Sequence, residues 1–202
     1  MKISIVGKGY MGSALGTLAT RSGHSVVFGL RDLEQLTTTV IPSADMVILA
    51  IPYAAALELV SNPNIQAALS GKIVVDITNP LAPDYKSLIV GYSSSAAEEI
   101  AAHLKDVRLI KAFNTIFDDL LRARVAGEAI TASVFCAGDD ADAKTQVLSL
   151  ISAMGLAGVD AGPLRNARYL EPISVLMLQL ANHLGHGTRI GFQLIHLSQP
   201  LP

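Results

Sequence analysis

Hydrophobic residues occur along the chain in short continuous runs rich in Val, Ile and Leu, separated by stretches with helical periodicity. Runs without polar alternation are typical of strands that are covered on both faces by helices. The pattern therefore predicts an α/β fold with a doubly wound parallel sheet. The expected strands are Lys2 to Val6, Ser25 to Phe28, Met46 to Ile51, Lys72 to Ile77, Val107 to Ile110, Ala132 to Ala137 and Ala157 to Asp160.

The connection between the second and third predicted strands is unusually short. A complete half of a doubly wound sheet would place a helix and a further strand there. The residues present leave room only for a short helix around Asp32 to Thr37. The sheet is therefore predicted to be trimmed after its second strand.

The last long helical pattern runs from about Arg165 to Leu184, and Pro172 is expected to start or kink it. One apolar stripe holds Tyr169, Ile173, Leu176, Leu180 and Leu184, and a second holds Leu170, Met177 and Ala181. A helix with apolar residues around so much of its circumference needs more cover than its own sheet provides. We therefore expect a homodimer with Leu176, Met177 and Leu180 near the centre of its interface.

Composition narrows the class of protein. Half of the residues are hydrophobic and 16% are charged, and the mean hydropathy is +0.44. These values are typical of a compact globular chain. Because no repeat or linker is visible, residues 1–202 are expected to form a single domain with the C-terminal helix 165–184 and a glycine-punctuated tail from Gly185 to Gly191.

Charge and hydropathy also exclude some functions. A net charge of −2 without a basic stripe argues against nucleic-acid binding. The apolar runs are much shorter than the roughly 18 residues of a membrane span. The N-terminal sequence begins a strand at once and leaves no room for a secretory signal. We therefore expect no membrane partner and a cytoplasmic location.

Residue types that often form metal or nucleophilic sites have simpler interpretations here. Cys136 is the only cysteine and lies in an apolar run, so a buried structural role is expected. His183 and His186 are three residues apart without a third ligand nearby, which predicts no metal site. Three acidic residues at the start of a helix are expected to cap it, namely Asp139, Asp140 and Asp142.

The segment from Gly7 to Gly12 fits the pattern G-x-G-x-x-G, between the first strand and a helix that opens at Tyr10. In this context Gly7 permits the tight turn, and Gly9 lets the backbone approach a pyrophosphate. The helix N-terminus adds unpaired N–H groups and the positive end of its dipole. The motif predicts a Rossmann-type dinucleotide site formed by Gly7, Lys8, Gly9, Tyr10, Met11 and Gly12.

The end of the second strand favours NADP over NAD. A carboxylate at the strand tip would bind the adenine ribose of NAD, whereas a cation there suits the 2′-phosphate of NADP. Leu30 lies at the tip, and Arg31 is the first charged residue. The planar guanidinium of Arg31 suits a phosphate. Asp32 follows, and it either caps the short helix or reads the ribose.

Further strand ends are expected to face the same crevice, since ligands of open α/β sheets lie outside the carboxyl ends of the strands. The small residues after the third strand leave room for the nicotinamide ribose, although the ring of Tyr53 could instead cover the core. These residues are Ala50, Ile51, Pro52 and Tyr53. Asn79 and Asn114 lie in the turns that follow two later strands. At such positions an asparagine can stabilise the turn or contact a ligand, and the sequence favours neither role.

A run of serines from Ser93 to Ser95, followed by Glu98, predicts a capping box at the start of a helix. This is a sufficient structural explanation for these residues. A helix start that is rich in hydroxyl groups could also receive an anionic ligand tail.

Several motifs taken in order resemble those of the coenzyme F420-dependent NADP oxidoreductases. They are the glycine turn, GLRD, VVDITNPL, KAFNT and DAGPLRNARYLEP, and together they cover nearly the whole chain. The chain is similar as well to the reductase domain of the six-transmembrane metalloreductases, which use a flavin. The resemblance departs at Leu30, where those reductases have a hydroxyl residue, and at the shortened crossover after Asp32.

The resemblance implies hydride transfer between NADP(H) and coenzyme F420, FMN or FAD bound as a small-molecule redox partner. It assigns Arg31, Asn79 and Ala112 to the NADP side. It assigns Pro80, Asn114 and Thr115 to the second ring system. Because the cofactors carry this chemistry, no catalytic side chain or metal is expected. The alternatives are a nonenzymatic NADP(H) sensor or scaffold and a flavin-mediated ferric reductase.

Overall fold

A seven-stranded sheet in the order β2-β1-β3-β4-β5-β6-β7 forms the centre of the computed structural model, which describes residues 1–196. The strands are β1 Lys2–Val6, β2 Ser25–Gly29, β3 Met46–Leu49, β4 Ile73–Asp76, β5 Arg108–Lys111, β6 Ser133–Gly138 and β7 Ala157–Asp160. The helices are α1 Tyr10–Arg21, α2 Leu33–Gln35, α3 Tyr53–Val60, α4 Pro63–Leu69, α5 Ala96–Ala102, α6 Asp118–Val125, α7 Ala141–Ala153 and α8 Ala167–Leu178. Residues 197–202 of the expected domain lie outside the described residues.

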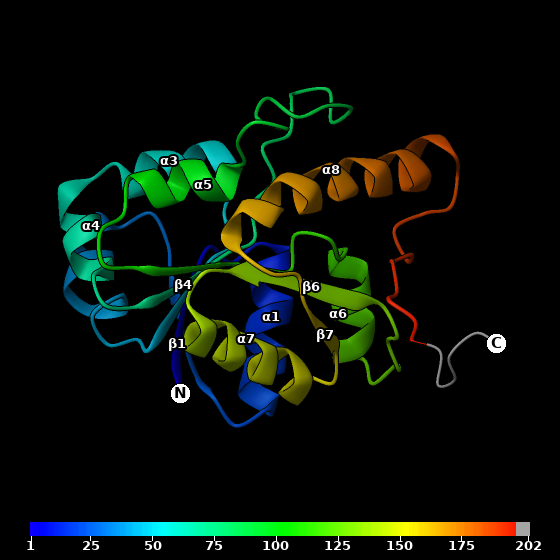
Figure 1. The fold of residues 1–202 in the computed structure, drawn as a ribbon. Helices are drawn as coiled ribbons and strands as arrows, with labels where there is room; N and C mark the ends of the chain where they lie inside the picture. Colours follow the sequence, from blue (N-terminus) through cyan, green and yellow to red (C-terminus); the bar gives the residue numbers. More distant parts are fainter. Residues whose placement is uncertain (197–202) are drawn as a thin grey trace.

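Helices cover both faces of the sheet, which explains the continuous apolar strands. Helices α1, α6 and α7 lie on one face, and α3, α4 and α5 lie on the other (Figure 1). The side chains of β3 alternate between two cores, with Met46 and Ile48 facing one and Val47 and Leu49 facing the other. All four are fully buried. The predicted doubly wound α/β class is confirmed.

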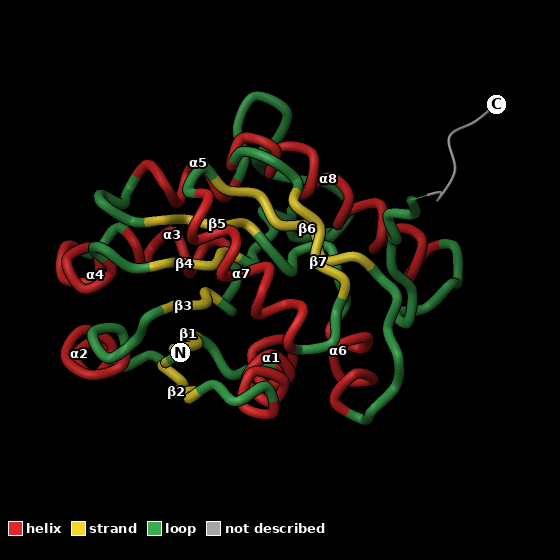
Figure 2. The backbone as a smooth tube through the Cα atoms, turned by 60° about the horizontal axis from the view of Figure 1, so that its bottom comes forward, coloured by secondary structure: helices red, strands yellow, loops and turns green. Residues whose placement is uncertain are grey.

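The order of strands reverses beside β1, which lies between β2 and β3 (Figure 2). The crossover from β2 to β3 is as short as expected and contains only α2 and a π-helical turn, Leu36–Val40. In open sheets of this kind ligands bind at the carboxyl ends of the strands where the order reverses. A ligand site is therefore expected at the carboxyl ends of β1 and β3.

The last two strands correct the prediction of a wholly parallel sheet. Strand β6 runs antiparallel to β5, and β7 is parallel to β6. Apolar runs identify strands but say nothing about direction, which depends on the edge of the sheet where the connecting segment returns. Only Gly138 and Ala137 of β6 pair with β5, opposite Ile110 and Lys111. Strand β6 therefore extends beyond the carboxyl end of β5.

Helix α8 forms within the predicted range, continued by short helical turns at Leu164–Asn166 and Gln179–His183. Pro172 lies inside α8, so it does not start the helix. The two apolar stripes have different surroundings. Met177 is only 2% exposed because its own chain covers it, whereas Leu176 is 51% exposed. The expectation that Met177 lies in a subunit interface is therefore wrong.

Three further findings concern residues 1–196. None of the helices described is long and apolar enough to cross a membrane. Within the same part of the chain, no three His, Cys, Asp or Glu side chains come together in a group that could hold a metal ion. Cys136 is buried, and burial raises the pKa of its thiol to about 12.

Candidate functional site

The glycine turn connects β1 to α1 and packs directly against the end of β3. Gly7 has a φ of +107°, and a Cβ placed on it would lie 2.2 Å from the carbonyl oxygen of Ala50. A Cβ on Gly12 would lie 2.3 Å from the carbonyl oxygen of Gly7. Both positions thus need glycine for the fold. A Cβ on Gly9, in contrast, would meet no atom of residues 1–196 within 4 Å other than those of its chain neighbours.

The open space above Gly9 lies at the N-terminus of α1. Gly9 is the N-cap of this helix, and no side chain caps it. The first N–H groups of a helix have no partner within the helix, so they are available to an anion. The turn therefore offers donors, a positive dipole end and room for a pyrophosphate.

The end of β2 presents an exposed cation beside this turn. Gly7 donates its backbone N–H to the carbonyl of Gly29 at 2.9 Å, which joins the two segments. Leu30 and Arg31 are exposed. Asp32 Oδ1 accepts a hydrogen bond from the backbone N–H of Gln35 at 3.0 Å, as the N-cap of α2. The capping interpretation of Asp32 is thus the one observed, and the exposed Arg31 next to it is a cation that suits a ligand phosphate.

Lys8 extends toward the same edge of the sheet. Its ammonium nitrogen lies 5.1 Å from the centre of the Phe28 ring on β2, in a cation–π contact. Tyr10, which opens α1, is exposed and lies under the guanidinium of Arg122. Neither side chain is buried.

The residues after β3 divide between the crevice and the core. Ala50 and Ile51 contact the glycine turn, and Pro52 is the N-cap of α3. The ring of Tyr53 belongs to the core and is buried, and its hydroxyl donates to the Glu99 carboxylate. Burial and this hydrogen bond raise the pKa of Tyr53. The structure therefore places the Tyr53 side chain over the core.

Asn79 and Asn114 follow β4 and β5 and bind one another. Asn79 Nδ2 donates to the Asn114 carbonyl at 3.0 Å, and Asn114 Nδ2 donates to Asn79 Oδ1 at 3.0 Å. Asn114 Nδ2 also donates to the Leu170 carbonyl of α8 at 3.1 Å. The pair thus joins two strand ends to the C-terminal helix.

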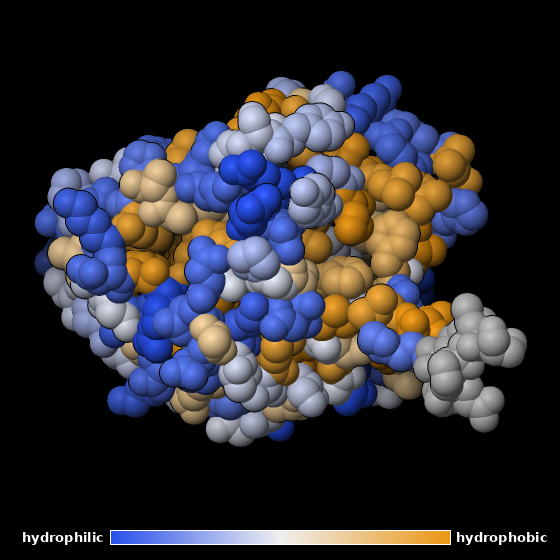
Figure 3. Space-filling view, in the orientation of Figure 1, coloured by the Kyte–Doolittle hydropathy of each residue, from blue (hydrophilic) through white to orange (hydrophobic). Residues whose placement is uncertain are grey.

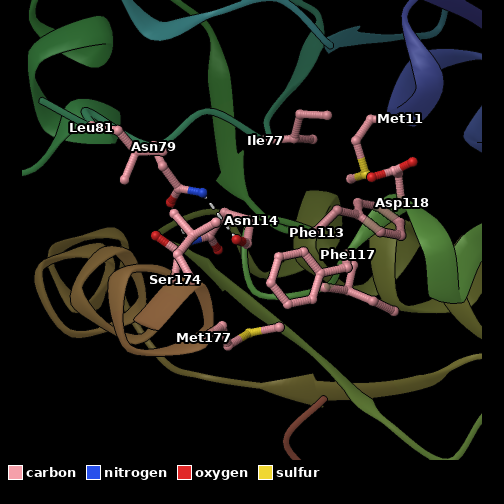
Figure 4. A pocket seen from close by; sticks show the side chains of 12 residues that line it. Met11, Ile77, Asn79, Leu81, Phe113, Asn114, Phe117, Asp118, Ser174 and Met177 are labelled. Atoms are coloured by element: carbon pink, nitrogen blue, oxygen red, sulfur yellow. Dashed lines mark hydrogen bonds between the residues drawn. The ribbon is translucent and has the colours of Figure 1, made fainter. Parts of the chain in front are cut away.

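A cavity of about 180 Å³ lies beside this pair, between the glycine turn and α8 (Figure 4). Met11, Asn79 and Asn114 line it, so the structure brings three of the predicted residues together. The rest of its wall comes from Ile77, Leu81, Phe113, Ile116, Phe117, Asp118, Ser174, Met177 and Leu178. The wall is mainly apolar, and among the described residues that line it Asp118 is the only ionisable one.

Three predicted residues lie next to this cavity without lining it. Ala112 is fully buried. Pro80 is buried and accepts a backbone hydrogen bond from Ile89 at 2.8 Å. Thr115 is buried, and its hydroxyl has no hydrogen-bond partner in the part of the chain that the structure describes.

A buried group of charges that the sequence analysis missed lies at the same strand ends. Lys111 is fully buried, and its ammonium group is 2.8 Å from both Asp76 and Glu171. It also donates to the Thr78 carbonyl at 2.6 Å. Glu171 belongs to α8 and accepts from the backbone N–H groups of Ala96 and Ala97 at 2.9 and 3.2 Å.

The pKa values of this group follow from its burial. Burial alone would lower the pKa of Lys111, but Asp76 and Glu171 outweigh it and hold the pKa above its ordinary value. Burial raises the pKa of Glu171, and Lys111 opposes that change. A break in the apolar pattern at the last residue of two buried strands was the available signal for Asp76 and Lys111. The sequence contains no such signal for Glu171, because this residue is far from Asp76 and Lys111 along the chain and only the fold brings the three together.

Helix α8 is also joined to α5. The guanidinium of Arg168 binds the Glu98 carboxylate through hydrogen bonds of 2.7 to 3.1 Å. Arg168 and the Ser95 hydroxyl hold the pKa of Glu98 below its usual value. Ser95 Oγ accepts from the Glu98 backbone N–H at 3.2 Å, as the predicted capping box requires. Hydroxyl and carboxylate are therefore both engaged in structural contacts.

Most of the cavity wall beyond Met11, Asn79 and Asn114 was not predicted. Phe113 has a φ of +60° and is fully buried, a conformation that directs its ring into the crevice. Met177 comes from a stripe of α8 and was assigned to subunit contact, whereas Leu178 belongs to neither predicted stripe. A sequence pattern shows which face of a helix is apolar, but not which neighbour covers it.

These features fit NADP(H). Gly9 and the start of α1 provide room and donors for the pyrophosphate. Arg31 suits the 2′-phosphate, and the apolar cavity beside Met11 suits a nicotinamide ring. No acid–base pair is needed for hydride transfer, because the cofactors supply its chemistry.

Comparison with known proteins agrees with this geometry. Residues 2–80 match the family described as NADP oxidoreductase coenzyme F420-dependent. The F420-dependent NADP reductase of Methanothermobacter thermautotrophicus is 27% identical over 210 residues, which cover 89% of each chain. Metalloreductase STEAP3 of Rattus norvegicus is 29% identical over 187 residues, 88% of this chain, although the match spans only 37% of its length.

A solved structure extends the likeness to the whole fold. The crystal structure assigned to an F420-dependent NADP-reductase of Arthrobacter sp. FB24 superposes with a TM-score of 0.84 at 25% identity, covering 97% of this chain and all of the other. The resemblance inferred from the motifs is thus confirmed. The chain is similar over most of its length to the coenzyme F420-dependent NADP oxidoreductases.

Proposed function

We propose that the protein transfers a hydride between NADP(H) and a deazaflavin, coenzyme F420, at the carboxyl edge of the sheet. The observation that carries this proposal is the continuity of the glycine turn with the apolar cavity through Met11, which belongs to the first turn of α1 and lines that cavity. A dinucleotide bound on the turn would have its nicotinamide end directed toward this cavity.

The chain's own residues bind and orient the reactants. The N-terminus of α1 binds the pyrophosphate, and Arg31 binds the 2′-phosphate. Phe113, Phe117 and Met177 form walls that exclude water from the reacting atoms. NADPH, when bound, supplies a hydride from its nicotinamide ring. The contribution of the protein is thus proximity, orientation and a dry environment.

The choice of deazaflavin rests on relatives. The reductase that matches this chain over 89% of both lengths is named for F420. The metalloreductase match favours a second candidate, in which a flavin passes electrons to ferric iron. The match covers only 37% of the metalloreductase. A chain of this length would therefore carry out only the part of that activity in which NADPH reduces the flavin.

The test is NADPH oxidation, followed by nicotinamide absorbance, with F420, FMN, FAD and ferric chelates offered in turn. Turnover with F420 and a colourless protein as purified are expected, because both ligands should exchange. Copurification of stoichiometric flavin, or turnover only with flavin and ferric chelate, supports the second candidate. NADPH binding without turnover on any acceptor would instead support a redox sensor.

A further inference from the structure

Asn114 has one hydrogen-bonding atom that the protein leaves without a partner. The residue is only 5% exposed, and it lines the cavity beside the glycine turn. Within residues 1–196 its Oδ1 accepts no hydrogen bond. A buried acceptor without a donor costs roughly 1–3 kcal/mol, so it is rarely retained without a use.

The orientation of the Asn114 amide is fixed by its neighbours. Nδ2 donates to Asn79 Oδ1 and to the Leu170 carbonyl, at 3.0 and 3.1 Å. A main-chain carbonyl can only accept, so exchanging the amide oxygen and nitrogen would bring two oxygen atoms together. Asn79 in turn has its own Nδ2 bound to the Asn114 carbonyl at 3.0 Å. Asn79 thus fixes the Asn114 amide, whose Oδ1 is left as a buried acceptor without a partner among the described residues.

The size of the cavity indicates which ring would donate to this acceptor. About 180 Å³ is close to the roughly 150 Å³ of an apolar cavity that holds benzene in another protein. One six-membered ring with a small substituent fits within such a space. Met11 on the wall places the cavity next to the glycine turn, where a dinucleotide would enter.

We propose that Asn114 Oδ1 accepts a hydrogen bond from the carboxamide NH₂ of the nicotinamide and so fixes the rotation of that ring. The carboxamide NH₂ is the only N–H donor on a nicotinamide ring. This inference rests on the proposed function, and it assigns Asn114 to the NADP side of the crevice in place of the second ring. Asn114 is then a residue that positions the nicotinamide ring.

The test compares two ligands by calorimetric titration. NADP⁺ carries the carboxamide, and its 3-acetylpyridine analogue has a methyl ketone in place of that group. The wild-type protein should bind NADP⁺ about 2- to 12-fold more tightly, as expected for one hydrogen bond of about 0.5–1.5 kcal/mol. In Asn114→Ala the ratio should fall to about one. Thr115→Val, which removes the neighbouring unpartnered hydroxyl, should keep the wild-type ratio.

A third ligand separates failure of this inference from failure of the proposed function. Adenosine diphosphate ribose 2′-phosphate lacks the nicotinamide, so its affinity should be the same for the wild type and Asn114→Ala. If it binds but the wild type does not distinguish NADP⁺ from the analogue, the inference about Asn114 is overturned. If neither it nor NADP⁺ binds, the proposed NADP site itself is wrong. The wild-type comparison decides the inference even if Asn114→Ala does not fold.

Discussion

Glu171 is a buried carboxylate whose ionised form is costly, and its pH response can be isolated by one substitution. Burial raises its pKa above the ordinary 4.5. A raised pKa means that the folded protein holds this proton more tightly than the unfolded chain does. The free energy of unfolding therefore falls as the pH rises from about 4.5 through the pKa of the folded state.

Glu171→Gln should remove this part of the pH dependence. Glutamine keeps an oxygen that can accept from Ala96 or Ala97, and Lys111 retains Asp76 as its partner. Each unit of pKa shift corresponds to about 1.4 kcal/mol. Urea unfolding between pH 4 and pH 8 measures the difference. Parallel curves for wild type and variant would show that Glu171 does not titrate in the folded protein.

Lys111→Met is the informative contrast, because it leaves both carboxylates buried without a cation. Removing one partner of a buried ion pair costs about 3–5 kcal/mol. Glu171→Gln should cost much less at neutral pH, since one carboxylate remains for one ammonium group. The same urea titration ranks the two variants. Equal losses would mean that contacts of α8, not charge balance, account for the stability.

Arg31 is the residue on which cofactor choice depends. Its guanidinium is exposed, and Asp32 is occupied as a helix cap. Hydrogen bonds to charged groups are worth roughly 1.5–3 kcal/mol, so Arg31→Ala should weaken NADPH binding about 10- to 100-fold. NADH, which lacks the 2′-phosphate, should lose little. Titration with both nucleotides decides, and equal losses would indicate that Asp32 reads the ribose of NAD.

Leu30→Ser is the matched gain-of-function variant. Leu30 is exposed and provides no hydroxyl for the 2′-phosphate. A serine there should tighten NADPH by roughly the 0.5–1.5 kcal/mol of an ordinary hydrogen bond, without affecting NADH. The fluorescence of bound NADPH measures this change. Tighter binding of both nucleotides would argue against a contact with the phosphate.

Among the elements, the β1–α1 turn separates folding from ligand binding. A Cβ on Gly12 would lie 2.3 Å from the Gly7 carbonyl oxygen, whereas one on Gly9 meets nothing within 4 Å. Gly12→Ala should therefore destabilise the fold by about 1–3 kcal/mol. Gly9→Ala should change stability by less than about 1 kcal/mol, yet weaken NADPH roughly tenfold or more by occupying the pyrophosphate space.

Thermal unfolding without nucleotide and titration with NADPH test this pair of variants. The important comparison is Gly9→Ala, which should unfold with the wild type but bind poorly. If Gly9→Ala binds NADPH as tightly as the wild type, the pyrophosphate does not lie over this turn. A reduced unfolding temperature for Gly9→Ala would instead mean that the turn is strained.

The elements also show what the sequence can reveal. Strand positions and the short crossover follow from local patterns, and so do the glycine turn and the caps at Asp32 and Ser95. The direction of β6 does not, because it depends on the path of a connection. The positive φ of Phe113 was equally hidden, since nothing in an aromatic residue favours that conformation.

In the whole molecule, long-range contacts decide what local patterns leave open. The cavity combines residues from Met11 to Leu178, and the buried charges join Asp76, Lys111 and Glu171. Sequence predicted the glycine turn and the two asparagines but not α8 as a wall of the crevice. The apolar stripe with Met177 covers that crevice, so only the other stripe of α8 is left for a partner.

That second stripe carries the last prediction, a homodimer. Tyr169 and Leu184 are each 66% exposed and Leu176 is 51% exposed. Figure 3 shows hydrophobic residues gathered on the α8 side of this face. Adjacent exposed apolar side chains commonly mark a protein interface. We expect a dimeric mass by light scattering at micromolar concentration.

Leu176→Asp should convert this dimer to a monomer without unfolding it, because the side chain faces solvent in the isolated chain. A charge placed in an apolar interface would be buried without a partner, which is strongly unfavourable. Tyr85→Ser is the matched control, since Tyr85 is 62% exposed but lies on a loop outside α8. It should leave the mass unchanged. A monomeric wild type would contradict the prediction, and so would a dimer that survives Leu176→Asp, because the interface would then lie elsewhere.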